Sequence, residues 1–137
     1  MVLVCASDAF VDVNNELFVA AMEENTTPQM IKDLIKSGAN VNAKTDNGET
    51  ALMWAVRHRN AEVVKALIEA GADINAKNNK GATALMLALI LNRSPAKTVQ
   101  ILIDSGADIF AKDNAGKTAL YYAKNDEIKK VILNSAQ

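Results

Sequence analysis

Two short blocks of sequence recur along this chain at a nearly constant interval, and this repetition limits the possible folds more than any other feature. The block Ser-Gly-Ala-Asn-Val-Asn-Ala-Lys at residues 37–44 returns in related form after 33 residues and again after a further 35 residues. The block Gly-Glu-Thr-Ala-Leu-Met at 48–53 returns at the same two intervals. Because both blocks keep the same phase across three copies, we predict an array of similar structural units.

The pattern within one unit predicts two helices followed by an extended excursion. Over residues 50–57 the apolar side chains share one helical face, and over residues 61–69 they recur with the 3.6-residue helical period. Asn60 is a good N-cap for the second helix. Gly71 ends that helix, because the position after a helix often needs left-handed backbone, which glycine adopts easily. Residues 73–77 then alternate polar and apolar side chains, and a polar turn containing a glycine follows.

One unit of this kind cannot bury its own apolar face, so its stability must come from stacking on neighbours. The pattern therefore predicts an all-α repeat solenoid of stacked helix-turn-helix units with short β-hairpin-like connecting loops. Both end units depart from the pattern, and we expect them to cap an array that is complete in this chain. The expected divisions are an N-terminal extension at 1–14, a capping repeat at 15–44, a second repeat at 45–77, a third repeat with a two-residue insertion at 78–112 and a C-terminal capping repeat at 113–137, in one domain overall.

The composition is that of an ordinary globular protein, and it narrows the possible partners. Lys and Arg together number 15 and Asp and Glu number 16, so a formal net charge of −1 provides no strong field to attract nucleic acid or an anionic membrane. No stretch approaches the roughly 20 apolar residues of a membrane-spanning helix. The single cysteine, Cys5, excludes an intramolecular disulfide and suits a cytoplasmic protein. Residues 1–7 could also be the remnant of a signal peptide on an exported protein.

The sequence lacks the residue clusters that catalysis and metal binding require. It contains one histidine, His58, and one cysteine, Cys5, and the repeat register places them in different units. They form no zinc-binding cluster, and no nucleophile stands in a recognisable arrangement with a base. The glycines occur singly, outside any phosphate-binding pattern. We therefore expect no enzyme activity, no cofactor and no metal.

The chain resembles the ankyrin repeat family over residues 15–137. The 33-residue period, the Gly-Ala-Asp-Ile-Asn-Ala block at 71–76 and the Gly-x-Thr-x-Leu block at 81–85 carry this resemblance. The chain departs from the family where Thr-Ala-Leu-Met, at 50–53 for example, replaces the usual Thr-Pro-Leu-His. The resemblance implies a curved stack whose inner helices and loop tips line a concave groove. It also implies a function in binding other proteins.

The resemblance further indicates where a partner would bind, because the loop tips and the variable positions of the inner helices would face the groove. Lys44, Lys77 and Lys112 recur in register and would form a ladder of positive charge. Such a ladder would suit an acidic strip on a partner, or it could be a hydrated edge without a binding role. The candidate partner-binding residues are Trp54, Arg57, His58, Leu87, Ile90, Tyr122, Lys44, Asp46, Asn47, Lys77, Asn79, Lys80, Lys112 and Asn114.

The candidates on the inner helices are the most informative, since Trp, Tyr and Arg dominate binding hot spots. If one wall of the groove is lined by Trp54, Leu87, Ile90 and Tyr122, they form an apolar patch with a polar rim. Trp54 and Tyr122 could equally pack between adjacent inner helices. Leu91 could simply anchor the longer turn of the third unit.

The leading interpretation is a monomeric protein–protein interaction module, acting as an adaptor, inhibitor or scaffold and binding one protein partner through the groove and the loop tips. Two alternatives remain open. The stack could be a structural protein that self-assembles through Trp54, Tyr122 or its last unit. It could also be a secreted effector that acts on a host protein.

Trp54 provides a first test of the predicted groove. We expect Trp54→Ala to leave the fold nearly intact and to weaken partner binding by roughly 2 kcal/mol or more, as for an aromatic hot spot. Calorimetric titration of the partner, with a thermal melt of each protein, measures both quantities. A large drop in melting temperature with unchanged affinity would show instead that Trp54 belongs to the core.

Overall fold

The computed structural model describes residues 13–58, 60–91 and 96–135, and within these ranges the chain forms eight α-helices and no β-strand. Residues 1–12 of the expected N-terminal extension, with Cys5, lie outside the described residues. The helices follow one another in four pairs. In chain order they are α1 (Val13–Met22), α2 (Pro28–Lys36), α3 (Ala51–Arg57), α4 (Ala61–Glu69), α5 (Ala84–Leu91), α6 (Ala96–Asp104), α7 (Ala119–Tyr122) and α8 (Asp126–Ser135).

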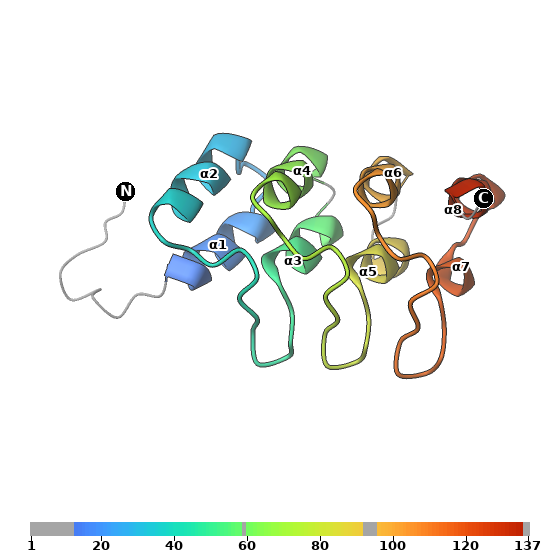
Figure 1. The fold of residues 1–137 in the computed structure, drawn as a ribbon. Helices are drawn as coiled ribbons and strands as arrows, with labels where there is room; N and C mark the ends of the chain where they lie inside the picture. The colour runs from blue at the N-terminus through green and yellow to red at the C-terminus, as the bar shows by residue number, and fades with distance from the viewer. Residues whose placement is uncertain (1–12, 59, 92–95, 136–137) are drawn as a thin grey trace.

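The helices form two rows, as Figure 1 shows. The odd-numbered helices contact one another in sequence and form the inner row, and the even-numbered helices form the outer row. Each inner helix also contacts the outer helix of its own pair. Three long loops, at 37–50, 70–83 and 105–118, extend to the same side of the inner row (Figure 1). The arrangement is an all-α repeat solenoid, which confirms the predicted fold class.

Local sequence signals set the helix ends. The side chains of Thr50 and Asn60 accept hydrogen bonds from the backbone amide three residues further on, at 3.4 and 3.2 Å, and so cap α3 and α4. Gly38, Gly71 and Gly106 follow the outer helices with φ angles of 104°, 99° and 100°. This is left-handed backbone that glycine adopts without strain, so these residues end the helices as the sequence predicts.

The apolar faces of the four pairs merge into one continuous core, which runs from Leu17 in α1 to Ile132 in α8. Ala55 and Ala88 are fully buried in the inner row, where their small side chains let neighbouring helices approach closely. Helix α5 is apolar on all sides, and residues 84–89 are all buried. It can be apolar throughout because α3 and α7 flank it and α6 covers it.

The last inner helix is shorter than the others. Helix α7 has four residues, whereas α3 has seven and α5 has eight. Thr118 stands at the N-cap of α7, but its side chain makes no capping hydrogen bond. The last pair therefore has the same arrangement as the others, but its inner helix contains fewer helical residues and lacks a side-chain cap.

Neighbouring loops are bonded to one another at their tips. The backbone amide of Asn79 donates to the carbonyl of Asn47, and that of Asn114 donates to the carbonyl of Lys80, both at 3.0 Å. The side-chain amide of Asn79 donates to the carbonyl of Asp46, and that of Asn114 to the carbonyl of Asn79, both at 2.9 Å. The tips of the second and third loops are thus each held in place by the tip before them.

A second set of bonds joins the bases of the first two loops to the end of the following outer helix. Asn42 accepts a hydrogen bond from the amide of Asp73 at 2.6 Å and donates to the carbonyl of Gly71 at 3.2 Å. Asn75 makes the equivalent two bonds one unit later, at 2.7 and 3.4 Å. In the third loop this position is Phe110, which is 68% exposed. Amide side chains therefore fix the spacing of the units together with the apolar core.

Gly81 and Gly116 form a matched pair for measuring the contact between loops. Both have a φ of 77°, where any other residue is strained. A Cβ on Gly81 would lie 2.6 Å from Asn114 Oδ1 and 2.8 Å from its backbone nitrogen, whereas a Cβ on Gly116 would meet nothing within 4 Å. We expect Gly116→Ala to lower the free energy of unfolding by about 1 kcal/mol, from backbone strain alone.

Gly81→Ala should cost at least about 1 kcal/mol more than Gly116→Ala, because the tip of the third loop must also move. Urea denaturation of the two variants and the unsubstituted protein measures the difference. Equal losses in the two variants would mean that contact between the loop tips adds nothing to the stability of the array.

Candidate protein-binding groove

A groove of about 450 Å³ opens where the loops meet the inner helices. All three loops contribute to it, together with α3, α5 and α7. Its lining residues therefore come from positions far apart in the sequence, and the stacking of the units brings them together. They are Asn47, Glu49, Arg57, Asn78, Asn79, Lys80, Ala82, Leu87, Ile90, Leu91, Asp113 and Tyr122.

The centre of the groove is apolar and belongs to α5. Leu87 is 6% exposed, Ile90 is 36% exposed and Leu91 is 48% exposed, so exposure rises toward the C-terminal end of the helix. A helix that is otherwise enclosed thus presents aliphatic side chains to solvent inside a hollow. Covering them with an apolar group of another molecule would be favourable, because apolar surface would be removed from water.

An ion pair forms one polar side of the groove. The Arg57 guanidinium donates hydrogen bonds to both carboxylate oxygens of Glu49. Glu49 itself is only 7% exposed. The guanidinium also lies over the Trp54 ring, with 4.6 Å between Cζ and the ring centroid. The carboxylate and the aromatic face together orient the guanidinium plane. Because the two charges compensate each other, this side of the groove is polar with little net charge.

A hydrogen-bonded pair forms the opposite side. The Tyr122 hydroxyl donates to the Asp113 carboxylate, and Asp113 also accepts from the backbone amides of Ala115 and Lys117, at 2.9 and 3.0 Å. The hydrogen bond from Tyr122, followed by the amide of Lys117, holds the pKa of Asp113 below its ordinary value, because both stabilise the ionised carboxylate. The same hydrogen bond raises the pKa of the Tyr122 hydroxyl. The Tyr121 ring packs edge-on against Tyr122, with 5.2 Å between centroids.

The groove brings together several of the residues that the sequence marked as candidates. They lie on two loops and three inner helices, as the resemblance implied for a concave surface. Those that line the groove are Arg57, Leu87, Ile90, Tyr122, Asn47, Asn79 and Lys80.

Seven of the fourteen candidates lie outside the groove, and three of these, besides the lysines, are exposed at a helix end or on a loop. His58 is exposed at the C-cap of α3, beside the turns that join the helices of the first two pairs. Asp46 is exposed on the first loop. Asn114 is exposed on the third loop, where its side chain bonds to the neighbouring tip. A partner in the groove could reach these residues only at the rim.

The three lysines of the predicted ladder are exposed and in register, but two of them bond to the protein itself. Lys44 Nζ donates to the carbonyl of Lys77 at 3.1 Å, and Lys77 Nζ donates to the carbonyl of Lys112 at 2.9 Å. Each ammonium group therefore reaches toward the next unit of the array. These bonds give Lys44 and Lys77 a structural role in addition to their charge.

Trp54 is half-buried and packs against the core without lining the groove. Its indole nitrogen is buried and has no hydrogen-bond partner in the part of the chain that the structure describes. Of the two interpretations that the sequence left open, packing between helices fits this placement better. Trp54 then acts on the groove through Arg57, which rests on its ring.

Some lining residues were not among the sequence candidates, and most of them also have a structural role. Asn78 Oδ1 accepts from the amides of Lys80 and Ala82, at 2.9 and 3.0 Å, and so shapes its own turn. Asp113 occupies the equivalent position in the third turn, where it accepts from the amides of Ala115 and Lys117. The sequence alone does not show that the Tyr122 hydroxyl bonds to it. The lining residues outside the candidate set are Glu49, Asn78, Ala82, Leu91 and Asp113.

The described residues show no sign of a metal site or a membrane span. In residues 13–58, 60–91 and 96–135, no group of three or more His, Cys, Asp or Glu side chains could hold a metal ion. No helix in this part of the chain is long and apolar enough to cross a membrane. Among the charged residues of the groove, Arg57 and Glu49 form an ion pair, and Asp113 is hydrogen-bonded to Tyr122.

Stacked helix pairs with linked loops along one edge define the class of solenoid repeat proteins, whose units bury a core jointly and display an extended surface. The sequence model of the ankyrin repeat family matches residues 17–113 as three copies. The chain therefore belongs to the ankyrin repeat family, which confirms the resemblance. Ankyrin repeats are generally protein–protein interaction modules, and the family is typically non-enzymatic. A comparison with curated proteins finds no match.

Tyr122→Phe tests the polar pair of the groove. The variant removes the largest cause of the lowered pKa of Asp113, so this pKa should rise toward its ordinary value of 3.8. A depressed folded-state pKa adds stability above the ordinary pKa, and that stability is lost as the pH falls through the folded-state pKa. At neutral pH the variant should therefore lose the part of the free energy of unfolding that comes from the lowered pKa of Asp113.

An NMR titration of the Asp113 carboxyl carbon measures the shift directly. Tyr121→Phe is the matched control, because the Tyr121 hydroxyl accepts a hydrogen bond from Lys117 Nζ at 3.1 Å and does not bond to Asp113. The control should shift the Asp113 titration far less than Tyr122→Phe does, because the charge of Lys117 is only a minor cause of the lowered pKa. An Asp113 pKa that is the same in the Tyr122→Phe variant and the unsubstituted protein would rule out the assigned cause.

Proposed function

We propose that this chain binds another protein through the groove between its loops and its inner helices, and that it works as an adaptor, inhibitor or scaffold. The single observation that carries the proposal is the apolar end of α5, exposed at the centre of a hollow of about 450 Å³ whose sides are polar. Membership of a family of interaction modules supports the same conclusion.

The chemistry of the groove suggests how affinity and selectivity would arise. Ile90 and Leu91 would cover an apolar side chain of the partner, and this burial would supply most of the binding free energy. The ion pair of Arg57 with Glu49 and the hydrogen-bonded pair of Asp113 with Tyr122 would stand at either side. A partner with an unpaired charge at these positions would be disfavoured, because Arg57, Glu49 and Asp113 already have partners.

The bonds between the loop tips favour binding as well. A mobile loop loses conformational freedom when it binds, and that loss weakens the complex. Here the tips are hydrogen-bonded to one another before any partner arrives, through both backbone and side-chain amides. The wall of the groove is therefore pre-organised, and the partner need not order it.

The experiment compares the unsubstituted protein with Ile90→Arg and Lys65→Glu as baits for affinity capture and mass spectrometry. Ile90 lies in the groove, and Lys65 is exposed on the outer helix α4. A protein captured by the unsubstituted chain and by Lys65→Glu but lost with Ile90→Arg is the groove partner. Calorimetry with the purified partner should then show Ile90→Arg binding at least about tenfold more weakly.

Circular dichroism and thermal melts verify that both variants keep the helical fold. Undiminished affinity of a folded Ile90→Arg variant for every captured protein would show that partners bind a different surface.

A further inference from the structure

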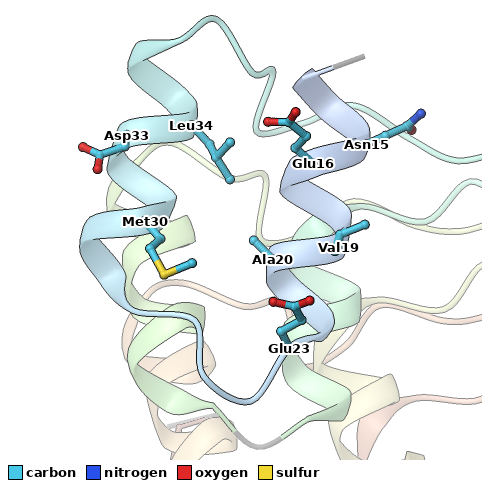
Figure 2. Close-up of a pocket in the computed structure, with 8 residues that line it drawn as sticks. All are labelled: Asn15, Glu16, Val19, Ala20, Glu23, Met30, Asp33 and Leu34. Carbon is cyan, nitrogen blue, oxygen red and sulfur yellow. The ribbon is translucent and has the colours of Figure 1, made fainter. Parts of the chain in front are cut away.

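The N-terminal end of the stack carries an apolar hollow with an acidic rim. It has a volume of about 470 Å³ and lies between α1 and α2, on the side away from the other pairs (Figure 2). Val19 is 47% exposed and Met30 is 44% exposed, and Figure 2 shows Met30 and Leu34 on α2 directed toward α1. The lining residues, which we call the N-terminal face, are Asn15, Glu16, Val19, Ala20, Glu23, Met30, Asp33 and Leu34.

The C-terminal end of the stack exposes positions that are covered in the second and third units. Tyr121 aligns with Met53 and Met86, which are 1% exposed, but Tyr121 is 63% exposed. Leu133 is 50% exposed and aligns with Ile68 and Ile103, which pack against the core. Those two units bury these positions because another pair follows them. The same positions on the last pair have no covering pair among the described residues.

Two residues of the third loop also stand at positions that contact the next unit in earlier repeats. Phe110 holds the position of Asn42 and Asn75, whose side chains bond to the next unit. Lys112 holds the position of Lys44 and Lys77, whose ammonium groups also reach the next unit. Both residues therefore stand where contact with a following unit is made. Phe110, Lys112, Lys117, Tyr121, Lys129 and Leu133 form what we call the C-terminal face.

The two faces are complementary in charge as well as in apolar character. The N-terminal face has three carboxylates, on Glu16, Glu23 and Asp33. On the C-terminal face, Lys129 aligns with Val64 and Val99, which are fully buried between units. It thus puts a positive charge where earlier units place an apolar contact.

A second lysine reinforces the positive character of the C-terminal face. Lys117 Nζ lies 4.2 Å from the centroid of the Tyr121 ring, so a charge and an aromatic surface are presented together. Two carboxylates, those of Asp126 and Glu127, occupy the first turn of α8. The basic character of this end is therefore concentrated on the loop and on the middle of α8.

We propose that the C-terminal face of one copy of this chain stacks on the N-terminal face of a second copy and continues both helix rows. The contact would repeat the packing that joins consecutive pairs within the chain, with Lys129 and Lys117 meeting the acidic rim. Because the two faces differ, the contact is heterologous and can add further copies. This proposal departs from the monomer expected from the sequence, and it uses surfaces separate from the groove.

Sedimentation velocity of the full chain over a wide concentration range tests the proposal. The unsubstituted protein should pass from monomers to dimers and longer chains as concentration rises. Met30→Asp blocks the N-terminal face and Leu133→Asp blocks the C-terminal face, so each variant alone should associate at least about tenfold more weakly. An equimolar mixture of the two variants retains one open face on each partner, and it should form dimers and nothing longer.

Leu91→Asp is the matched control, because Leu91 is 48% exposed and lies in the middle of the array. It should associate like the unsubstituted protein. Glu23→Lys and Lys129→Glu provide a second pair of variants at exposed positions, where packing is undisturbed. Each should weaken association about tenfold, and the unsubstituted protein should associate more weakly as salt rises.

Three results would overturn head-to-tail stacking. The first is an unsubstituted protein that stays monomeric at every concentration, as it would if residues 1–12 or a different protein covers the N-terminal face. The second is dimerisation of Leu133→Asp by itself, which would indicate that two N-terminal faces pair. The third is a mixture of the two blocked variants that contains only monomers.

Discussion

Every helix pair in this protein depends on the pair beside it to bury its apolar surface. Helix α5 is the extreme case, since it is apolar on all sides and becomes stable only when α3, α6 and α7 surround it. The small side chains of Ala55 and Ala88 permit the close approach, and the side chains of Asn42 and Asn75 fix the spacing from unit to unit. Stability in such an array is a sum over contacts between neighbours, and the ends necessarily differ from the middle.

The groove results from this stacking of the helix pairs. The loops lie on one side of the inner row because the first three outer helices are each followed by a left-handed glycine that sends the chain back in the same direction. The tips then bond to one another and form a wall beside the exposed end of α5. Arg57 pairs with Glu49 and Tyr122 with Asp113 inside single units, whereas the loop-tip amides bond across units. These bonds shape the surface without a partner. If the groove is the binding surface that we propose, its capacity to bind follows from the repeat itself, and its selectivity rests on the few residues that differ between units.

The features that the sequence predicts well are those governed by local chemistry. The helix-ending glycines, the Asn60 cap and the apolar stripes depend on neighbouring residues, and the structure has them where the pattern predicts. Contacts between units are harder to predict, because they depend on how far one unit is shifted against the next. The contact of Arg57 with the Trp54 ring and the hydrogen bond of Tyr122 to Asp113 each lie within one unit, but they depend on which way the side chains turn, and the residue pattern does not determine that. The sequence is equally compatible with Trp54 lying in the core or in the groove, and with Asp113 serving the turn or the groove.

The short helix α7 links local stability to the groove. With four residues and no side-chain cap, it is the inner helix with the fewest interactions of its own, so the array should open first at this end. Tyr122 is its last residue, and Asp113 stands on the loop that leads into it, so fraying would remove one side of the groove. A ligand that requires this side binds only the form in which α7 is intact. Such a ligand therefore protects the backbone amides of the last pair from hydrogen exchange. The degree of that protection reports how much of the groove the ligand occupies.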